Sequence, residues 1–126
     1  MKRKRVLALA LVLAATLPVA AEASCIPMTR AEQRERASVI FDGVALEGPT
    51  ATGIQRFHVI TYVKGAGPKT VRVATGEMRQ AGGGVVVTSV SLHVVRGERW
   101  RIFSRGSARR VLQTSVCDGS RRLSRG

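Results

Sequence analysis

The stretch Leu112–Ser120, "LQTSVCDGS", contains one of the two cysteines of the chain and decides how the fold can be held together. Cys117 has a single candidate partner, Cys25, so only one disulfide pairing is possible. That bond would close a loop of 92 residues (117 minus 25) and stabilise the fold by about 4–5 kcal/mol in the chain-entropy model. A metal or redox site is the alternative, but the chain has no Cys-x-x-Cys and only two histidines. We therefore predict a structural disulfide, with no metal and no cofactor.

The amino terminus has the three-part pattern of an export signal. Lys2–Arg5 is basic, Val6–Ala15 is an unbroken apolar run, and Ala21–Ala23 matches the A-x-A cleavage pattern. The apolar run is shorter than the roughly 20 residues needed to cross a bilayer. We predict that residues 1–23 are a signal peptide and that residues 24–126 form one exported domain, periplasmic or extracellular, without a membrane-spanning segment. Export favours the disulfide, because thiols oxidise outside the cytosol. Cleavage directly before Cys25, with lipid anchoring there, is a variant of the same interpretation.

The chain is strongly basic. The predicted signal peptide holds four basic residues and one acidic residue, so the net charge of +13 falls to +10 for residues 24–126. Such a charge attracts polyanions, which for an exported protein means an anionic envelope polymer or an acidic protein. The alternative is that the charges are scattered over a solvated surface. Nucleic acid is disfavoured, because single-strand binders need stacking aromatics and the few here lie in predicted strands. The candidate partner-binding residues are Arg99, Arg101, Arg109, Arg110, Arg121 and Arg122.

Most of the chain after the predicted cleavage site has the pattern of short strands. Thr29–Ala37 is the exception, because Thr29 and Glu32 have capping-box spacing, and we predict a short surface helix there. Turn residues separate six candidate strands, which indicates an all-β barrel or sandwich. The tail at residues 118–126 is predicted to be loose. The candidate strands are Ser38–Leu46, Arg56–Val63, Lys69–Thr75, Val85–Val95 (the longest), Arg99–Ser104 and Val111–Val116, with Gly76–Gly84 as a flexible connection.

Five segments in order carry a family resemblance: "ASVIFDGVAL" (Ala37–Leu46), "YVKG" (Tyr62–Gly65), "VRVAT" (Val71–Thr75), "GERWRIFS" (Gly97–Ser104) and "LQTSVCDGS". In this order the chain resembles the netrin-like domain, the fold of tissue inhibitors of metalloproteinases, and above all its small exported bacterial members. The resemblance implies a five-stranded, or six-stranded, OB-type Greek-key barrel. It also implies that Cys25 ties the N-terminal segment to the last strand.

The same resemblance suggests roles for three residues. Phe41 and Gly43 would belong to the first strand, with Gly43 where that strand bends, and Gly97 would form the turn that delivers Trp100 to the core. Two features depart from the family: the Gly76–Gly84 connection has no further cysteine, and "CIPMTR" lacks the Cys-x-Cys start of the animal inhibitors. Those inhibitors bind the target's zinc through a first-residue cysteine, whereas cleavage after Ala23 would leave Ser24 in front of Cys25.

The remaining polar residues do not form a recognisable catalytic motif. The acids after the predicted cleavage site form no motif with His58 or His93, which both fall in strand patterns and are expected to be packed or half-exposed. Gly82–Gly84 precedes a predicted strand and not a helix, unlike a phosphate-binding loop. We predict a non-enzymatic binding module, or alternatively a metalloprotease inhibitor acting near Cys25. The acids are Glu32, Glu35, Asp42, Glu47, Glu77, Glu98 and Asp118.

Overall fold

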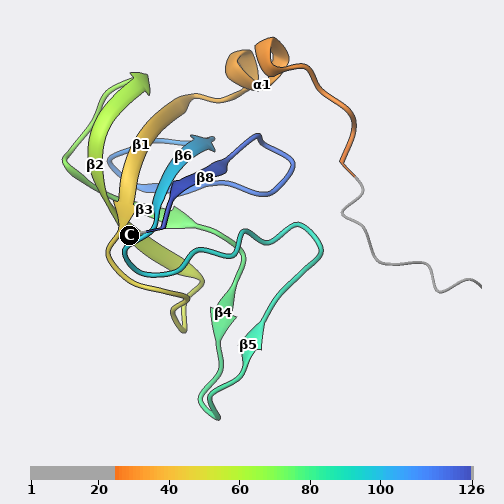
Figure 1. The fold of residues 1–126 in the computed structure, drawn as a ribbon, viewed down its shortest axis with the longest axis vertical. Coiled ribbons are helices and arrows are strands. Elements are labelled where there is room, and N and C mark those ends of the chain that lie inside the picture. The colour runs from red at the N-terminus through yellow and green to blue at the C-terminus, as the bar shows by residue number, and fades with distance from the viewer. Residues whose placement is uncertain (1–24, 126) are drawn as a thin grey trace, which may run out of the picture.

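The computed structural model describes residues 25–125, which are mostly β-strands with one short helix (Figure 1). The predicted signal peptide and its cleavage site lie outside the described residues. Helix α1 (Arg30–Arg36) comes first and confirms the predicted surface helix, with the Oγ1 of Thr29 accepting a hydrogen bond from the Glu32 N–H at 3.2 Å. The strands are β1 (Val39–Ala45), β2 (Ile54–Lys64), β3 (Thr70–Ala74), β4 (Met78–Arg79), β5 (Val85–Val86), β6 (Arg99–Ser104), β7 (Val111–Gln113) and β8 (Arg121–Ser124).

Six of the strands form one curled sheet in the order β7-β3-β2-β1-β6-β8 (Figure 1). The neighbouring strands are antiparallel, except that β3 and β7 run parallel. Strand β7 also meets the end of β6 through an antiparallel bridge between Arg105 and Gln113, so the sheet curls back toward itself. The prediction of an all-β, barrel-like architecture is confirmed.

The inside of the curled sheet is filled by alternate residues of its strands. Phe41 and Phe57 are fully buried and meet edge to face, with ring centroids 5.8 Å apart. Trp100 lies in the same cluster, as the family resemblance implied, and Gly97 before it has a φ of 87°. Each large apolar side chain buried here stabilises the fold by about 1.5–3 kcal/mol, which makes this cluster the main source of stability.

The pairing of β1 with β2 is irregular beside Gly43. Asp42 pairs with Thr61 and Gly43 with Val59, so Ile60 of β2 is the extra residue, as in a β-bulge. A Cβ atom at Gly43 would lie 2.8 Å from the carbonyl oxygen of His58 and 2.9 Å from the ring of Phe41. Glycine therefore allows β2 and the core ring to approach the backbone of β1 beside this shift of register.

The prediction of one long strand over Val85–Val95 is wrong. Only Val85–Val86 is a strand, paired with β4 in a separate hairpin, so the predicted flexible connection also contains a strand. After the hairpin the chain turns, with the Ser91 N–H donating to the Thr88 oxygen at 3.1 Å. Leu92 and Val94 then enter the core. Burial of these two side chains outweighs the local preference of the valines for a continuous strand.

A buried polar network fixes that returning segment. The Nε2 of Gln55 donates to the carbonyl oxygens of Val94 and Glu47 at 3.0 and 3.1 Å. The hydroxyl of Thr75 donates to the Oε1 of Gln55 at 2.7 Å. Gln55 and Thr75 have no exposed surface, so these hydrogen bonds are formed away from water.

The prediction of a loose tail is also wrong for most of its length. Strand β8 (Arg121–Ser124) pairs with β6, placing Arg122 opposite Trp100 and Arg121 opposite Arg101. Just before it, the Ser120 hydroxyl accepts a hydrogen bond from the Phe103 N–H at 2.9 Å. The tail is ordered through hydrogen bonds to the edge of β6 and not through apolar burial. Among residues 25–125 no helix is both long and apolar enough to cross a membrane.

Candidate functional site

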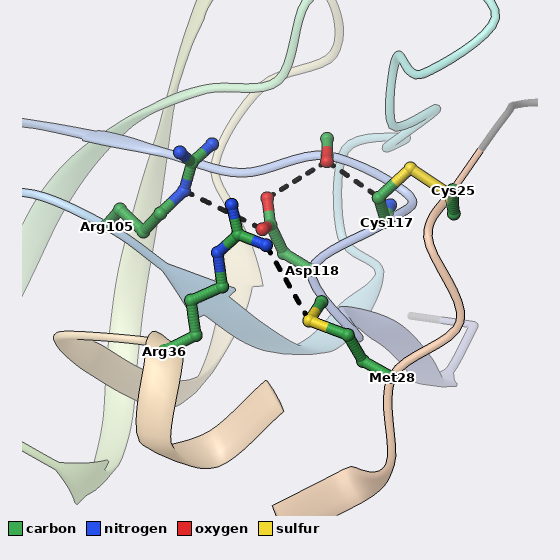
Figure 2. Close-up of a disulfide and its surroundings, with 7 residues drawn as sticks. Cys25, Met28, Arg36, Arg105, Cys117 and Asp118 are labelled. Carbon is green, nitrogen blue, oxygen red and sulfur yellow. Dashed lines mark hydrogen bonds and ion pairs between the residues drawn. A yellow bond between two sulfur atoms is a disulfide. The ribbon is translucent and has the colours of Figure 1, made fainter. Parts of the chain in front are cut away.

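The predicted disulfide between Cys25 and Cys117 is present, with the two Cα atoms 5.3 Å apart (Figure 2). Cys117 lies in the turn between β7 and β8. The Ser115 hydroxyl accepts a hydrogen bond from the Cys117 N–H at 3.2 Å and donates one to Asp118 at 2.9 Å. Arg105 approaches the other oxygen of Asp118 at 3.7 Å. The bond therefore joins the segment before α1 to a turn whose own geometry is held by hydrogen bonds.

A small hollow lies beside this disulfide. Its volume is about 180 Å³, and Met28 and Arg36 lie on its wall, joined by a contact of 3.7 Å between Nη1 and Sδ. Ile26, the residue after Cys25, is 80% exposed. The N-terminal edge thus offers the exposed side chain of Ile26 next to a covalently fixed backbone.

The structure divides the six arginines that the sequence nominated into three groups. Arg99, Arg101 and Arg121 surround Asp42 on the outer face of β1, β6 and β8. Arg101 lies opposite Asp42 and donates to both of its oxygens, at 2.7 and 2.9 Å. These hydrogen bonds hold the pKa of Asp42 below its usual value against the opposing effect of burial, and the charges of Arg101, Arg99 and Arg121 lower the pKa further. Asp42 in turn neutralises part of the positive charge of these three arginines.

Replacing Asp42 by asparagine should lower the free energy of unfolding by about 1–3 kcal/mol at pH 7, because a nearly buried ion pair is lost. The folded state lowers the pKa of Asp42, so the stabilisation is present above the usual value of 3.8 and is lost as the pH falls through the folded value. Urea unfolding from pH 7 to pH 2 should show the two proteins converging in acid. A difference that stays constant down to pH 2 would contradict this assignment.

Arg122 belongs to a second group and has a structural role. Its Nη1 lies 3.0 Å from the Oε2 of Glu98, whose Oε1 accepts from the Val95 N–H at 2.7 Å and from the Trp100 indole at 3.3 Å. Burial raises the pKa of Glu98, but these hydrogen bonds outweigh burial and lower the pKa overall. Arg122 is therefore committed to holding the turn that precedes β6.

Arg109 and Arg110 form the third group, in the turn between β6 and β7. Arg109 lines an open hollow of about 390 Å³ together with Gly67 and Pro68. The same two residues border a larger hollow of about 480 Å³ over the end of β2 and the turn into β3. We call these adjoining concavities the β2–β3 hollow. Its lining residues are His58, Val59, Ile60, Thr61, Tyr62, Gly67, Pro68, Lys69 and Arg109.

Close approach of two turns creates the β2–β3 hollow. A Cβ atom on Gly67 would lie 2.5 Å from the Cβ of Ala108 and 2.7 Å from the Tyr62 hydroxyl, so glycine is required for this contact. The Tyr62 hydroxyl donates to the carbonyl oxygen of Pro68 at 2.6 Å and fixes the turn from the other side. Burial raises the pKa of Tyr62, which stays a neutral donor at pH 7. Lys69 and Arg109 are thereby held on the rim of one concave surface.

Among residues 25–125, no acidic side chain lines the β2–β3 hollow. Five of the seven acids in the described part of the chain pair with basic side chains elsewhere, and the other two, Glu32 and Glu35, lie on α1. The cations of the hollow therefore keep their positive potential, unlike the group around Asp42. The five pairs are Asp42–Arg101, Glu47–Arg56, Glu77–His93, Glu98–Arg122 and Asp118–Arg105.

The two histidines have different surroundings. His58 is exposed on β2 and lines the β2–β3 hollow, whereas the Nδ1 of His93 lies 2.8 Å from the Oε2 of the nearly buried Glu77. Within residues 25–125, His, Cys, Asp and Glu side chains do not gather in threes at any point. The β2–β3 hollow is thus defined by its concave shape and its positive charge. Arg109 could be nominated from its charge, whereas His58, Ile60 and Lys69 could not. Pairing of β2 with β3 and packing of the turns around Gly67 bring these residues to one surface.

The chain was compared with protein-family models, curated proteins and solved structures, and none of the three comparisons found a match.

Proposed function

We propose that this protein is an exported, non-enzymatic binding module of the OB type that holds an anionic polymer in the β2–β3 hollow. The observation that carries the proposal is a concave surface on which the described part of the chain places cations and no acid. The predicted signal peptide and the Cys25–Cys117 disulfide support export, since such bonds persist outside the cytosol.

The strand order supports the OB assignment. An OB-fold is a partly open, five-stranded Greek-key barrel that binds polymers on the face of its second and third strands and on nearby loops. Here β1, β2 and β3 are consecutive antiparallel neighbours, β7 pairs in parallel with β3, and the Arg105–Gln113 bridge links β7 to the end of β6. The netrin-like order of sequence segments supports the same assignment. The β2–β3 hollow lies where an OB-fold would place its ligand.

The chemistry of the hollow favours an anionic polysaccharide or the sugar-phosphate part of an envelope lipid. Lys69 and Arg109 supply the charge, and Ile60 and Tyr62 add apolar surface on which a sugar ring can rest. Such a ligand combines repeated anions with flat apolar faces. An acidic protein carries carboxylates but no sugar rings, which makes it the poorer match.

Binding of residues 24–126 to immobilised heparin, as a stand-in polyanion, should weaken steeply as salt rises. The double variant Lys69→Ala/Arg109→Ala should bind about tenfold more weakly at 0.1 M salt, since each exposed ionic contact contributes about 0.2–1 kcal/mol. Arg99→Ala/Arg121→Ala is the matched control, with the same loss of charge beside Asp42, and should change binding far less. An equal effect of both variants would indicate diffuse attraction, and retention independent of salt would contradict the proposal altogether.

One observation favours a second candidate, a metalloprotease inhibitor acting through the N-terminal edge. Ile26 is exposed directly after the disulfide-bound Cys25, as expected for a contact residue. This function requires that the mature chain begin at Cys25. N-terminal sequencing followed by an inhibition assay with a zinc endopeptidase separates the two candidates, because a start at Ser24 without inhibition rules the second one out.

A further inference from the structure

The β4–β5 hairpin projects away from the curled sheet (Figure 1). Its apolar side chains are exposed to solvent. It belongs to the segment with the strongest sequence preference for β-structure, of which only two residues are in a strand. The conformation that the sequence favours and the conformation observed therefore differ most in this segment. The exposed apolar residues of this segment are Met78, Val85, Val86, Val87, Val90 and Val95.

The outer edge of β5 has free backbone groups. Gln80 donates to the Gly84 oxygen at 2.7 Å, which makes these two residues a hydrogen-bonded pair of the hairpin. Hydrogen-bonded and non-hydrogen-bonded pairs alternate in an antiparallel ladder, so the next pair, Arg79 and Val85, turns its backbone groups outward. Arg79 follows this pattern, because its N–H donates to the Thr50 oxygen at 2.8 Å. On the opposite edge, Val85 meets no further strand of the described chain.

Charge indicates which partner suits this edge. Residues 80–95 contain no Asp, Glu, Lys or Arg, and they form the longest such stretch of the described chain. A second copy of a protein with a net charge of +10 is repelled by most of the molecule, but not by this segment. An anionic partner would gain little from this segment, because the cation of the hairpin, Arg79, lies on β4 and not on the outer edge of β5.

We infer that the outer edge of β5 pairs in antiparallel fashion with the same edge of a second copy, forming a two-fold symmetric dimer. This pairing satisfies the outward backbone groups of Val85 and lets the exposed valines of both copies cover one another. It also extends β5 into the residues that favour a strand but lack a partner in the monomer. The inference is independent of the function proposed for the β2–β3 hollow.

The test is sedimentation equilibrium of the disulfide-bonded protein, residues 24–126, at concentrations up to about 1 mM. The wild-type protein should show a reversible monomer–dimer equilibrium. The dimer should strengthen with added salt, because salt screens repulsion between two basic copies. Polyanion binding has the opposite salt dependence, so the two activities cannot be confused.

Val85→Lys should weaken the dimer about tenfold or more, since the variant places like charges near one another across the two-fold axis. Val63→Lys is the matched control, because both valines are 43% exposed and the charge change is the same, and it should leave the dimer intact. Thermal unfolding checks that both variants fold, and Val87→Lys, outside the β4–β5 ladder, repeats the test without altering the hairpin. The inference would be overturned if the wild-type protein were monomeric at every concentration, or if its edge bound only a strand of another protein. A dimer that neither Val85→Lys nor Val87→Lys weakens would also overturn it.

Discussion

Replacing Cys117 by serine will lower the free energy of unfolding by about 3–5 kcal/mol, the largest effect that we expect from any single substitution. The disulfide joins residues 92 positions apart, so its loss restores much conformational freedom to the unfolded chain. It also releases the segment before α1, which has no other covalent tie to the β7–β8 turn. For a domain of this size the melting temperature should fall by roughly 15 °C or more.

Thermal and urea unfolding of residues 24–126 measure this effect. Cys25→Ser and the double variant Cys25→Ser/Cys117→Ser serve as controls and should lose as much stability as Cys117→Ser, because all three lack the same single bond. A wild-type melting temperature that is unchanged by a reducing agent would contradict the assigned role of the disulfide.

The second large effect concerns the buried amide of Gln55. Gln55→Leu should lower the free energy of unfolding by about 3–4 kcal/mol, because the Val94 oxygen and the Thr75 hydroxyl lose their buried partner. Loss of the bond to Val94 also frees the segment that fills one end of the core. Urea unfolding with coincident fluorescence and circular dichroism transitions provides the measurement.

A double-mutant cycle separates the network from simple packing. Thr75→Val removes the hydroxyl that Gln55 accepts from, so the double variant Gln55→Leu/Thr75→Val leaves no unpaired Thr75 donor. Its cost should be smaller than the sum of the two single costs by about 1 kcal/mol or more. Strict additivity, or a cost of Gln55→Leu below 1 kcal/mol, would be inconsistent with the hydrogen-bond network.

The elements that follow from local chemistry could be predicted from the sequence. The Thr29 cap predicted the helix, and short runs of strand-favouring residues between turns predicted the strands that became β1, β2, β3 and β6. The two cysteines predicted the bond that joins the ends of the domain, because no other pairing exists. In each case the structure depends on residues close together in the sequence, or only one pairing exists.

The predictions that were wrong concern segments whose structure depends on residues distant in the chain. Val85–Val95 has a strong local preference for a strand, but Leu92 and Val94 gain more from burial in the core. The tail is polar and lacks a periodic pattern, yet β8 forms because the edge of β6 offers free backbone groups. Neither the curvature of the sheet nor the position of that edge can be predicted from composition or periodicity.

The same limit applies to the candidate site. The six nominated arginines share only their charge in the sequence, whereas their surroundings separate them. Arg101 is ion-paired with Asp42, and Arg122 is ion-paired with Glu98. Arg109 lies on the rim of the β2–β3 hollow, where no carboxylate of the described residues offsets its charge. Acidic partners and concave surfaces arise from pairing between strands that are distant in the chain, so charge alone could not rank these residues.

Intact-mass spectrometry of the protein secreted by a bacterium that expresses the whole chain, after treatment with an alkylating agent under denaturing conditions, tests the central claim most directly. If the protein is an exported barrel closed by one bond, the mass will correspond to residues 24–126 less two hydrogens, with no alkyl group added. A chain that keeps its first 23 residues and carries two alkyl groups would contradict both the proposed export and the covalent closure.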